Sequence, residues 1–255
     1  MMPAELPWII AASFGAGFVD SMVGGGGLIM VPALFAAFPR ELPTVLLGTG
    51  KIASICGTVT AVARYSRSVA IAWRFLLPAA VLTFACSLAG AYTVTRVPVA
   101  GFRPLVPVLL SIVACYTFLH RDFGERHAPH VLTGARWWIA TVLIAAIGFY
   151  EGFFGPGTGS FFMFMFVRVF GYDFLNAAAS ARLLNVAGNA AALVFFATRV
   201  ELLWVCGLSM AVSNVAGSLV GTRLALRRGA AFVRVVFLLV VAALIAKTAW
   251  DAITA

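Results

Sequence analysis

The stretch Gly17-Phe-Val-Asp20-Ser-Met-Val-Gly24-Gly-Gly-Gly27 lies inside a long apolar segment that we expect to run from about Trp8 to Phe38. Each of the four consecutive glycines costs about 1 kcal/mol relative to alanine in a helix interior, so together they predict a break in the helix. In lipid, such a break is tolerated only where it is buried in protein or lines a cavity. Asp20 precedes the break by one turn, and a carboxylate in an apolar span is a candidate functional group.

A second stretch, Gly148-Phe-Tyr-Glu151-Gly-Phe-Phe-Gly155-Pro-Gly-Thr-Gly159, has the same pattern of an acid followed by a glycine-rich break. It lies 131 residues further along the chain. The same offset relates Gly17 to Gly148, Asp20 to Glu151, Gly24 to Gly155, Lys51 to Arg182, Gly57 to Gly188, Ser87 to Ser218 and Arg103 to Arg234. A register that holds without a gap over this distance indicates two copies of one unit.

Composition indicates an integral membrane protein. The mean hydropathy is +1.02, with 62% hydrophobic and 11% charged residues, which lies outside the range of soluble domains. The net charge of +9 comes mostly from arginines that separate apolar segments. This pattern favours loops that face anionic lipid headgroups over a nucleic-acid surface. The four cysteines lie singly within apolar segments, so neither a disulfide framework nor a metal site is predicted.

We expect an all-α, polytopic membrane protein of about eight transmembrane helices in two four-helix repeats, with the first helix of each repeat broken at its glycine-rich motif. The expected segments are 8–38, 44–65, 75–95, 104–119, 137–167, 174–198, 202–226 and 233–250. The first repeat covers 1–119, a polar linker that holds all three histidines covers 120–135, and the second repeat covers 136–255. Four spans per repeat imply parallel repeats, whereas broken segments that double back imply inverted repeats. The sequence leaves both arrangements and the membrane orientation open.

Each half carries one cation and two hydrogen-bonding side chains on one helical face. Lys51, Ser54 and Thr58 have the spacing i, i+3, i+7, which places them on one side of a helix. Their counterparts at the 131-residue offset are Arg182, Asn185 and Asn189. Two cations and two acids within spans cost on the order of 10 kcal/mol before pairing. These groups therefore need internal partners, water or a ligand.

Two interpretations of these charges remain open. In the first, Asp20 pairs with Lys51 and Glu151 pairs with Arg182, which neutralises the buried charge. In the second, the half-helix after each glycine run directs its N–H groups and positive dipole end into the membrane interior and, with the cations, forms an anion site twice. Asp20 and Glu151 then carry protons or hold the cations. The predicted substrate-binding residues are Gly24, Gly25, Gly26, Gly27, Lys51, Ser54, Gly155, Gly157, Thr158, Arg182 and Asn185.

Three motifs carry a family resemblance over nearly the whole chain. They are the stretch from Gly17 to Pro32, the stretch from Gly148 to Ser160, and Ala181-Arg-Leu-Leu-Asn185. These motifs resemble the TauE/SafE family of bacterial membrane permeases. The resemblance implies a multi-pass carrier of the bacterial inner membrane, with members linked to export of sulfite, sulfoacetate and other small organosulfur or organic anions. The closest subfamily usually has asparagine at Gly50 and lysine at Arg182, and arginine favours planar, bidentate oxyanions.

The sequence therefore predicts a secondary transporter of a small anion, coupled to protons and embedded in a lipid bilayer. No P-loop for ATP is present, no cofactor or nucleic-acid partner is expected, and the oligomeric state is open between a monomer and a homo-oligomer. A passive anion channel is the alternative, because it shares the charged site but conducts without coupling to protons. An intramembrane enzyme is not expected, since no histidine lies in the spans and no motif places Ser21 or Ser160 against a base.

Overall fold

The structure is a computed structural model that describes residues 6–96, 124, 127–129 and 133–254. Every secondary-structure element within these residues is an α-helix, which confirms the predicted all-α class. The expected segment 104–119 and most of the expected linker 120–135 lie outside the described residues.

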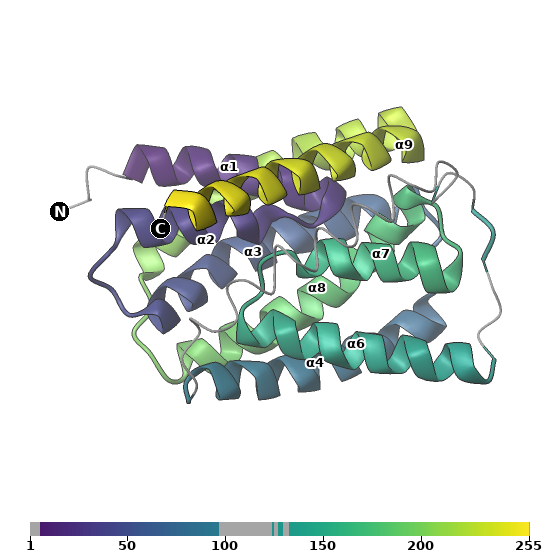
Figure 1. Cartoon of the computed structure of the whole chain (residues 1–255), viewed down its shortest axis with the longest axis horizontal. Helices are drawn as coiled ribbons and strands as arrows, with labels where there is room; N and C mark the ends of the chain where they lie inside the picture. The colour runs from purple at the N-terminus through teal and green to yellow at the C-terminus, as the bar shows by residue number, and fades with distance from the viewer. Residues whose placement is uncertain (1–5, 97–123, 125–126, 130–132, 255) are drawn as a thin grey trace.

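The described helices pack as one bundle (Figure 1). They are α1 (Leu6–Val23), α2 (Gly26–Ala37), α3 (Pro43–Tyr65), α4 (Trp73–Val94), α6 (Ala135–Phe153), α7 (Thr158–Phe170), α8 (Phe174–Ala197) and α9 (Trp204–Thr254). Among them α1, α3, α4, α8 and the part of α9 from Trp204 to Val240 are long and apolar enough to cross a membrane. Their lengths support a multi-pass membrane protein.

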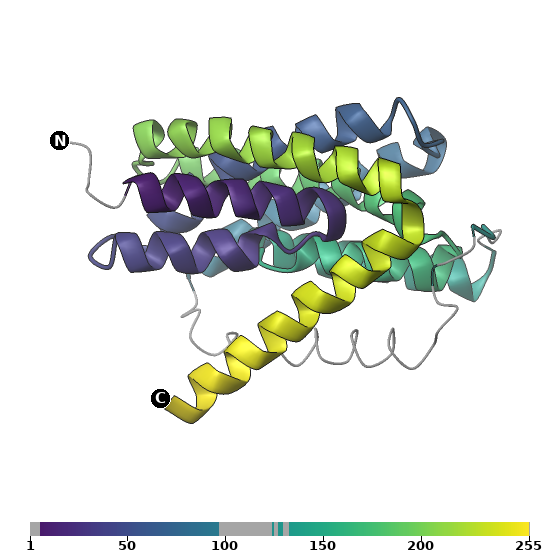
Figure 2. The ribbon, with the colours of Figure 1, turned by 90° about the horizontal axis from the view of Figure 1, so that it is seen from above.

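The last helix, α9, consists of two arms that meet at a kink. Gly229 has a φ of 74° within it, a conformation that glycine adopts without steric cost. The expected segments 202–226 and 233–250 correspond to these two arms. Figure 2 shows the second arm running back from the kink, diagonally away from the first arm.

The two glycine-rich stretches each separate a long helix from a short one. α1 ends at Val23 before α2, and α6 ends at Phe153 before α7. The turns use positive φ values of 83° at Gly24, 91° at Gly155 and 87° at Gly157, which favour glycine.

In both halves the short helix folds back along the long one (Figures 1 and 2). Ile9 near the start of α1 accordingly shares a hydrophobic cluster with Leu34 near the end of α2. The expected segments 8–38 and 137–167 are therefore helical hairpins and not single spans with a central break. A physical reason is length, because the 12 residues of α2 and 13 of α7 extend only about 18–20 Å, less than the ~30 Å of a hydrocarbon core.

The helices fall into two sets of opposite direction along the long axis of the bundle. α1, α3 and the first arm of α9 run one way, and α4, α6 and α8 run the other (Figure 1). Neighbours approach closely at small residues. A Cβ atom added to Gly217 would lie 2.1 Å from the carbonyl oxygen of Phe14, and one added to Gly152 would lie 1.8 Å from that of Ser87. Such close approach of helix backbones at glycine is typical of membrane helix packing.

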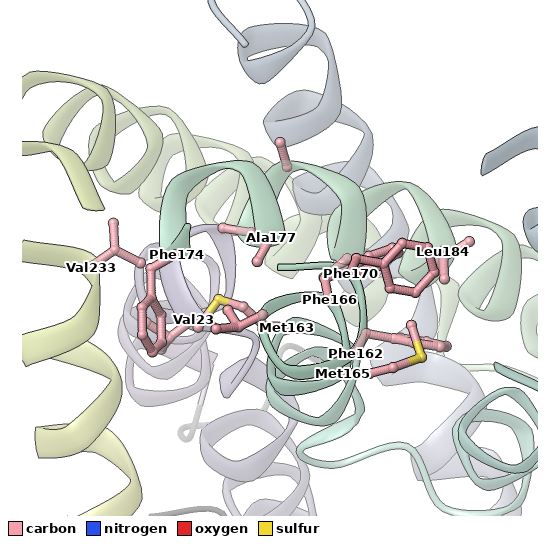
Figure 3. Close-up of a cluster of buried hydrophobic side chains, with 14 of the residues drawn as sticks. Val23, Phe162, Met163, Met165, Phe166, Phe170, Phe174, Ala177, Leu184 and Val233 are labelled. Carbon is pink, nitrogen blue, oxygen red and sulfur yellow. The ribbon is translucent and has the colours of Figure 1, made fainter. Parts of the chain in front are cut away.

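The largest hydrophobic cluster surrounds α7 at the end of the bundle where α8 begins. Phe162, Phe166 and Phe170 of α7 are almost fully buried there, together with Phe174 of α8 and Phe237 of α9. Figure 3 shows part of this cluster. Aromatic side chains thus make up much of the packing between α7, the start of α8 and α9.

The close approach of α4 and α6 gives a stability prediction. We expect Gly152→Ala to destabilise the protein by about 1–3 kcal/mol, because the new methyl group meets the backbone of Ser87. Gly15→Ala is the matched control, since a Cβ at this helical glycine meets nothing within 4 Å. Thermal unfolding in detergent measures both variants. Equal melting temperatures for the two would contradict the packing described above.

Candidate functional site

The turns of the two hairpins meet in the middle of the protein. A Cβ atom on Gly24 would lie 2.2 Å from the carbonyl carbon of Gly159, and one on Gly27 would lie 3.1 Å from Cα of Pro156. Ser160 Oγ also donates a hydrogen bond of 2.7 Å to the carbonyl oxygen of Val23. The glycines of one break are therefore required for the close approach of the other.

Lys51 of α3 contacts the end of α6. Its Nζ donates to the main-chain carbonyl oxygen of Glu151 at 3.2 Å and forms an ion pair with Oε1 of the same residue. Lys51 is 8% exposed and Glu151 is 4% exposed. Because the last carbonyl groups of a helix lack intrahelical partners, this cation satisfies both the backbone and the carboxylate.

Arg182 of α8 makes the equivalent contacts with the end of α1. Its Nη1 donates to the main-chain carbonyl oxygen of Asp20 and lies 3.2 Å from Oδ2 of that residue. The Arg182 side chain is completely buried, whereas that of Asp20 is 20% exposed. Asp20 Oδ1 also accepts a hydrogen bond of 3.2 Å from the N–H group of Gly26, at the start of α2. A carboxylate in this place compensates the positive end of the helix dipole.

These two ion pairs correct one of the sequence interpretations. Pairing of Asp20 with Lys51, and of Glu151 with Arg182, is wrong. Each cation instead binds the acid of the other half, and among the described residues no ion pair joins the cation and acid of the same half. The reason is that α1 and α6 both end in the centre of the bundle. The end of α1 lies against α8, and the end of α6 lies against α3.

A cavity of about 40 Å³ lies between the two breaks, which is large enough to hold a water molecule. Two acids, one cation, several polar side chains, glycines and one proline form most of its wall. These residues are Asp20, Gly24, Gly27, Gly50, Lys51, Ser54, Glu151, Gly155, Pro156, Gly159, Asn185 and Asn189. Four apolar side chains, Met30, Val31, Leu47 and Phe154, complete the lining.

The structure places the predicted substrate-binding residues in two groups. Gly24, Gly27, Lys51, Ser54, Gly155 and Asn185 line the cavity, as do both acids. Gly25, Gly26, Gly157, Thr158 and Arg182 lie outside the lining. Sequence reasoning did not assign Gly50, Pro156, Gly159 and Asn189 to the site. Their positions in the sequence could have identified them. Pro156 and Gly159 lie within the second glycine motif, Gly50 precedes Lys51, and Asn189 lies on the predicted polar face of α8.

Two buried polar atoms beside the cavity have no hydrogen-bond partner within the described part of the chain. They are Arg182 Nη2 and Asn185 Oδ1. Both side chains border Gly159, where an added Cβ would lie 2.8 Å from Arg182 Nη2 and 2.6 Å from Asn185 Nδ2. An unsatisfied buried polar group costs about 1–3 kcal/mol. One donor and one acceptor are thus available to a polar ligand.

The ionised cluster is electrically neutral, with the charges of Lys51 and Arg182 balanced by those of Asp20 and Glu151. An anion that enters alone adds an uncompensated charge to apolar surroundings, which is strongly unfavourable. An anion that binds here therefore needs one compensating positive charge.

Comparison with known proteins finds a family of membrane transporters. The model of the family described as sulfite exporter TauE/SafE matches residues 9–248. A probable membrane transporter protein, ORF9 of Sinorhizobium sp., is 36% identical over 244 residues, which cover 94% of this chain and 90% of the relative. The probable membrane transporter protein YfcA of Escherichia coli K12 is 33% identical over 236 residues, or 92% and 86% of the two chains.

A probable membrane transporter protein of Haemophilus influenzae is 28% identical over 245 residues, which cover 95% of this chain and 94% of the relative. No solved structure matches the chain. The family match over almost the full length confirms the resemblance that the glycine motifs predicted. The chain belongs to the TauE/SafE family of membrane transporters.

Proposed function

We propose that this transporter is a secondary carrier of the bacterial inner membrane that moves a small anion coupled to protons. The description of the family names sulfite, and the family resemblance of the motifs extends the proposed substrate class to related organosulfur or organic anions. The observation that supports the proposal best is the Lys51–Glu151 ion pair on the wall of a central cavity. The buried cation is paired with a single carboxylate, so protonation of that carboxylate would leave the cation free to bind an anion.

In the proposed mechanism Glu151 exchanges places with the substrate. Protonation of Glu151 weakens its hold on the ammonium group of Lys51, and the anion then takes the position of the carboxylate. Ser54 and Asn185 line the same cavity and supply hydrogen bonds that orient the anion. Proton and anion cross together, because either one alone leaves unpaired charge in a low-dielectric interior.

Arg182 and Asp20 have a different part in this proposal. Arg182 does not line the cavity and is completely buried. Its Nη1 binds the end of α1. Its Nη2 is available to a ligand that reaches Gly159 and Asn185. Asp20 is bound both to Arg182 and to the start of α2. We therefore assign the coupling proton to Glu151 rather than to Asp20.

We also infer that the described parts of the regions 1–119 and 136–255 are inverted repeats that interlock. Contacts at equivalent positions support this inference, because Ser87 Oγ donates to the carbonyl oxygen of Gly188 at 2.8 Å and Ser218 Oγ donates to that of Gly57 at 2.7 Å. The opposite directions of α1 and α6 support it as well. Inverted repeats around a central site provide two equivalent conformations, one open to each side of the membrane.

A flux assay in liposomes tests the proton coupling. We expect wild-type protein to move sulfite faster when a pH gradient is imposed. Glu151→Gln should remove the stimulation by the gradient, because the amide keeps the shape of the side chain but carries no titratable proton. Glu41→Gln is the control, since this acid is exposed and lies outside the cavity. Gradient-dependent flux in folded Glu151→Gln protein would exclude Glu151 as the coupling group.

A counterflow assay separates a carrier from the alternative, a passive channel. We expect sulfite inside the liposomes to accelerate uptake of labelled sulfite, because a carrier exchanges its substrate through one alternating site. Lys51→Met should lower this exchange about 10- to 100-fold, the effect of losing a hydrogen bond from a charged donor. Elution in size-exclusion chromatography checks that the variant is folded. An ohmic sulfite current without exchange would instead identify a channel.

A further inference from the structure

A second, larger cavity opens at the end of the bundle where α3 begins and α4 and α8 end. Its volume is about 510 Å³. We call it the vestibule. The residues of its lining that matter here are Thr44, Leu47, Tyr92, Arg96, Phe195 and Arg199.

The charged side chains that the structure describes in the vestibule lining are two arginines. The guanidinium carbon of Arg96 lies 4.9 Å from the ring centroid of Tyr92, and that of Arg199 lies 5.8 Å from the ring centroid of Phe195. The two rings are themselves in edge contact, with centroids 6.4 Å apart. Aromatic faces thus hold both guanidinium groups.

Neither Arg96 nor Arg199 forms an ion pair with any acid that the structure describes. Glu41 and Glu201 are close in the chain to lining residues, but both are exposed and neither lines the vestibule. The vestibule therefore carries positive charge, unlike the neutral central cluster. An arginine just beyond a helix C-terminus also compensates the helix dipole. That effect explains the position of each arginine but not why both line one cavity.

The vestibule and the central cavity share one lining residue, Leu47. Thr44, Leu47, Lys51 and Ser54 have the spacing i, i+3, i+7, i+10 on α3 and form one stripe that leads from the vestibule to the ion pair. Leu47 lies about 6 Å along the helix axis from Lys51. Its side chain is 4% exposed and packs in a cluster with Phe196 and Leu202. The hydrophobic cluster around α7 contains Phe162, Phe166 and Phe170 (Figure 3).

We propose that the vestibule is an anion-attracting access site for the central cavity, with Arg96 and Arg199 as its anion-binding groups and Leu47 as the closed gate. This proposal rests on the function proposed above, because it assumes that an anion is bound at Lys51. The ligand class is a small oxyanion, since a guanidinium group binds such anions with two parallel hydrogen bonds. A reversible displacement of the Leu47 side chain would connect the two cavities.

Thiol labelling tests the vestibule without reference to transport. The four native cysteines are replaced by alanine, and Thr44→Cys is introduced in the vestibule wall. Purified protein at low ionic strength is labelled with a sulfonate-bearing methanethiosulfonate and, separately, with a trimethylammonium-bearing one. We expect the anionic reagent to react faster, after correction for the rates with a small neutral thiol. The combined variant Arg96→Gln/Arg199→Gln should lower this preference about 10-fold.

Arg40→Gln is the matched control, because Arg40 is exposed in the loop before α3 and does not line the vestibule. It should leave the preference unchanged. Leu47→Cys provides a second labelling position if the Thr44→Cys protein does not fold. Equal rates for the two reagents, or an equal loss of preference in Arg40→Gln, would overturn the proposal.

Sulfite uptake by the same variants separates this proposal from the proposed function. Arg96→Gln/Arg199→Gln should raise the half-saturating sulfite concentration about 10-fold and leave the maximal rate unchanged. Labelling that favours the anionic reagent in a wild-type protein that moves no sulfite would support the charged vestibule and contradict sulfite transport. Sulfite uptake by a protein that reacts equally fast with both reagents would support sulfite transport and contradict the charged vestibule.

Discussion

The centre of this protein depends on two ion pairs, each between a cation of one half of the chain and an acid of the other half. Lys51 and Arg182 each bind both the carboxylate and the main-chain carbonyl group of an acid at the end of a helix from the other half. A helix that ends inside a membrane protein exposes carbonyl groups that lipid cannot satisfy. The crossed cations satisfy these groups and neutralise the acids at the same time.

Other side chains also satisfy carbonyl groups at the end of α1. The carbonyl oxygen of Ser21 accepts a hydrogen bond from Tyr65 Oη, and that of Val23 accepts one from Ser160 Oγ. The end of α1 is therefore held by side chains from α3, α7 and α8. These contacts fix the position at which α1 ends in this conformation. The proposed transport cycle begins with the protonation of one acid and does not require a break to unfold.

The sequence was sufficient to identify most of the chemistry of the site, because an acid or a lysine in an apolar segment has few structural explanations. The 131-residue offset predicted that Asp20 is the counterpart of Glu151 and that Lys51 is the counterpart of Arg182. It did not predict their partners, because the direction of α2 and α7 after each break depends on tertiary contacts. Proximity in the chain favoured pairing within each half, whereas the hairpins bring each acid to the cation of the other half. The vestibule has no local motif, since the ends of α3, α4 and α8 form it together.

Double-mutant cycles on unfolding in detergent test the crossed pairing most directly. The cycles combine Asp20→Asn, Lys51→Met, Glu151→Gln and Arg182→Met in all four acid–cation pairs. We predict a coupling energy of at least about 1 kcal/mol for Lys51 with Glu151 and for Arg182 with Asp20, and smaller values for the two pairs within one half. Stronger coupling of Asp20 with Lys51 and of Glu151 with Arg182 would contradict the crossed arrangement.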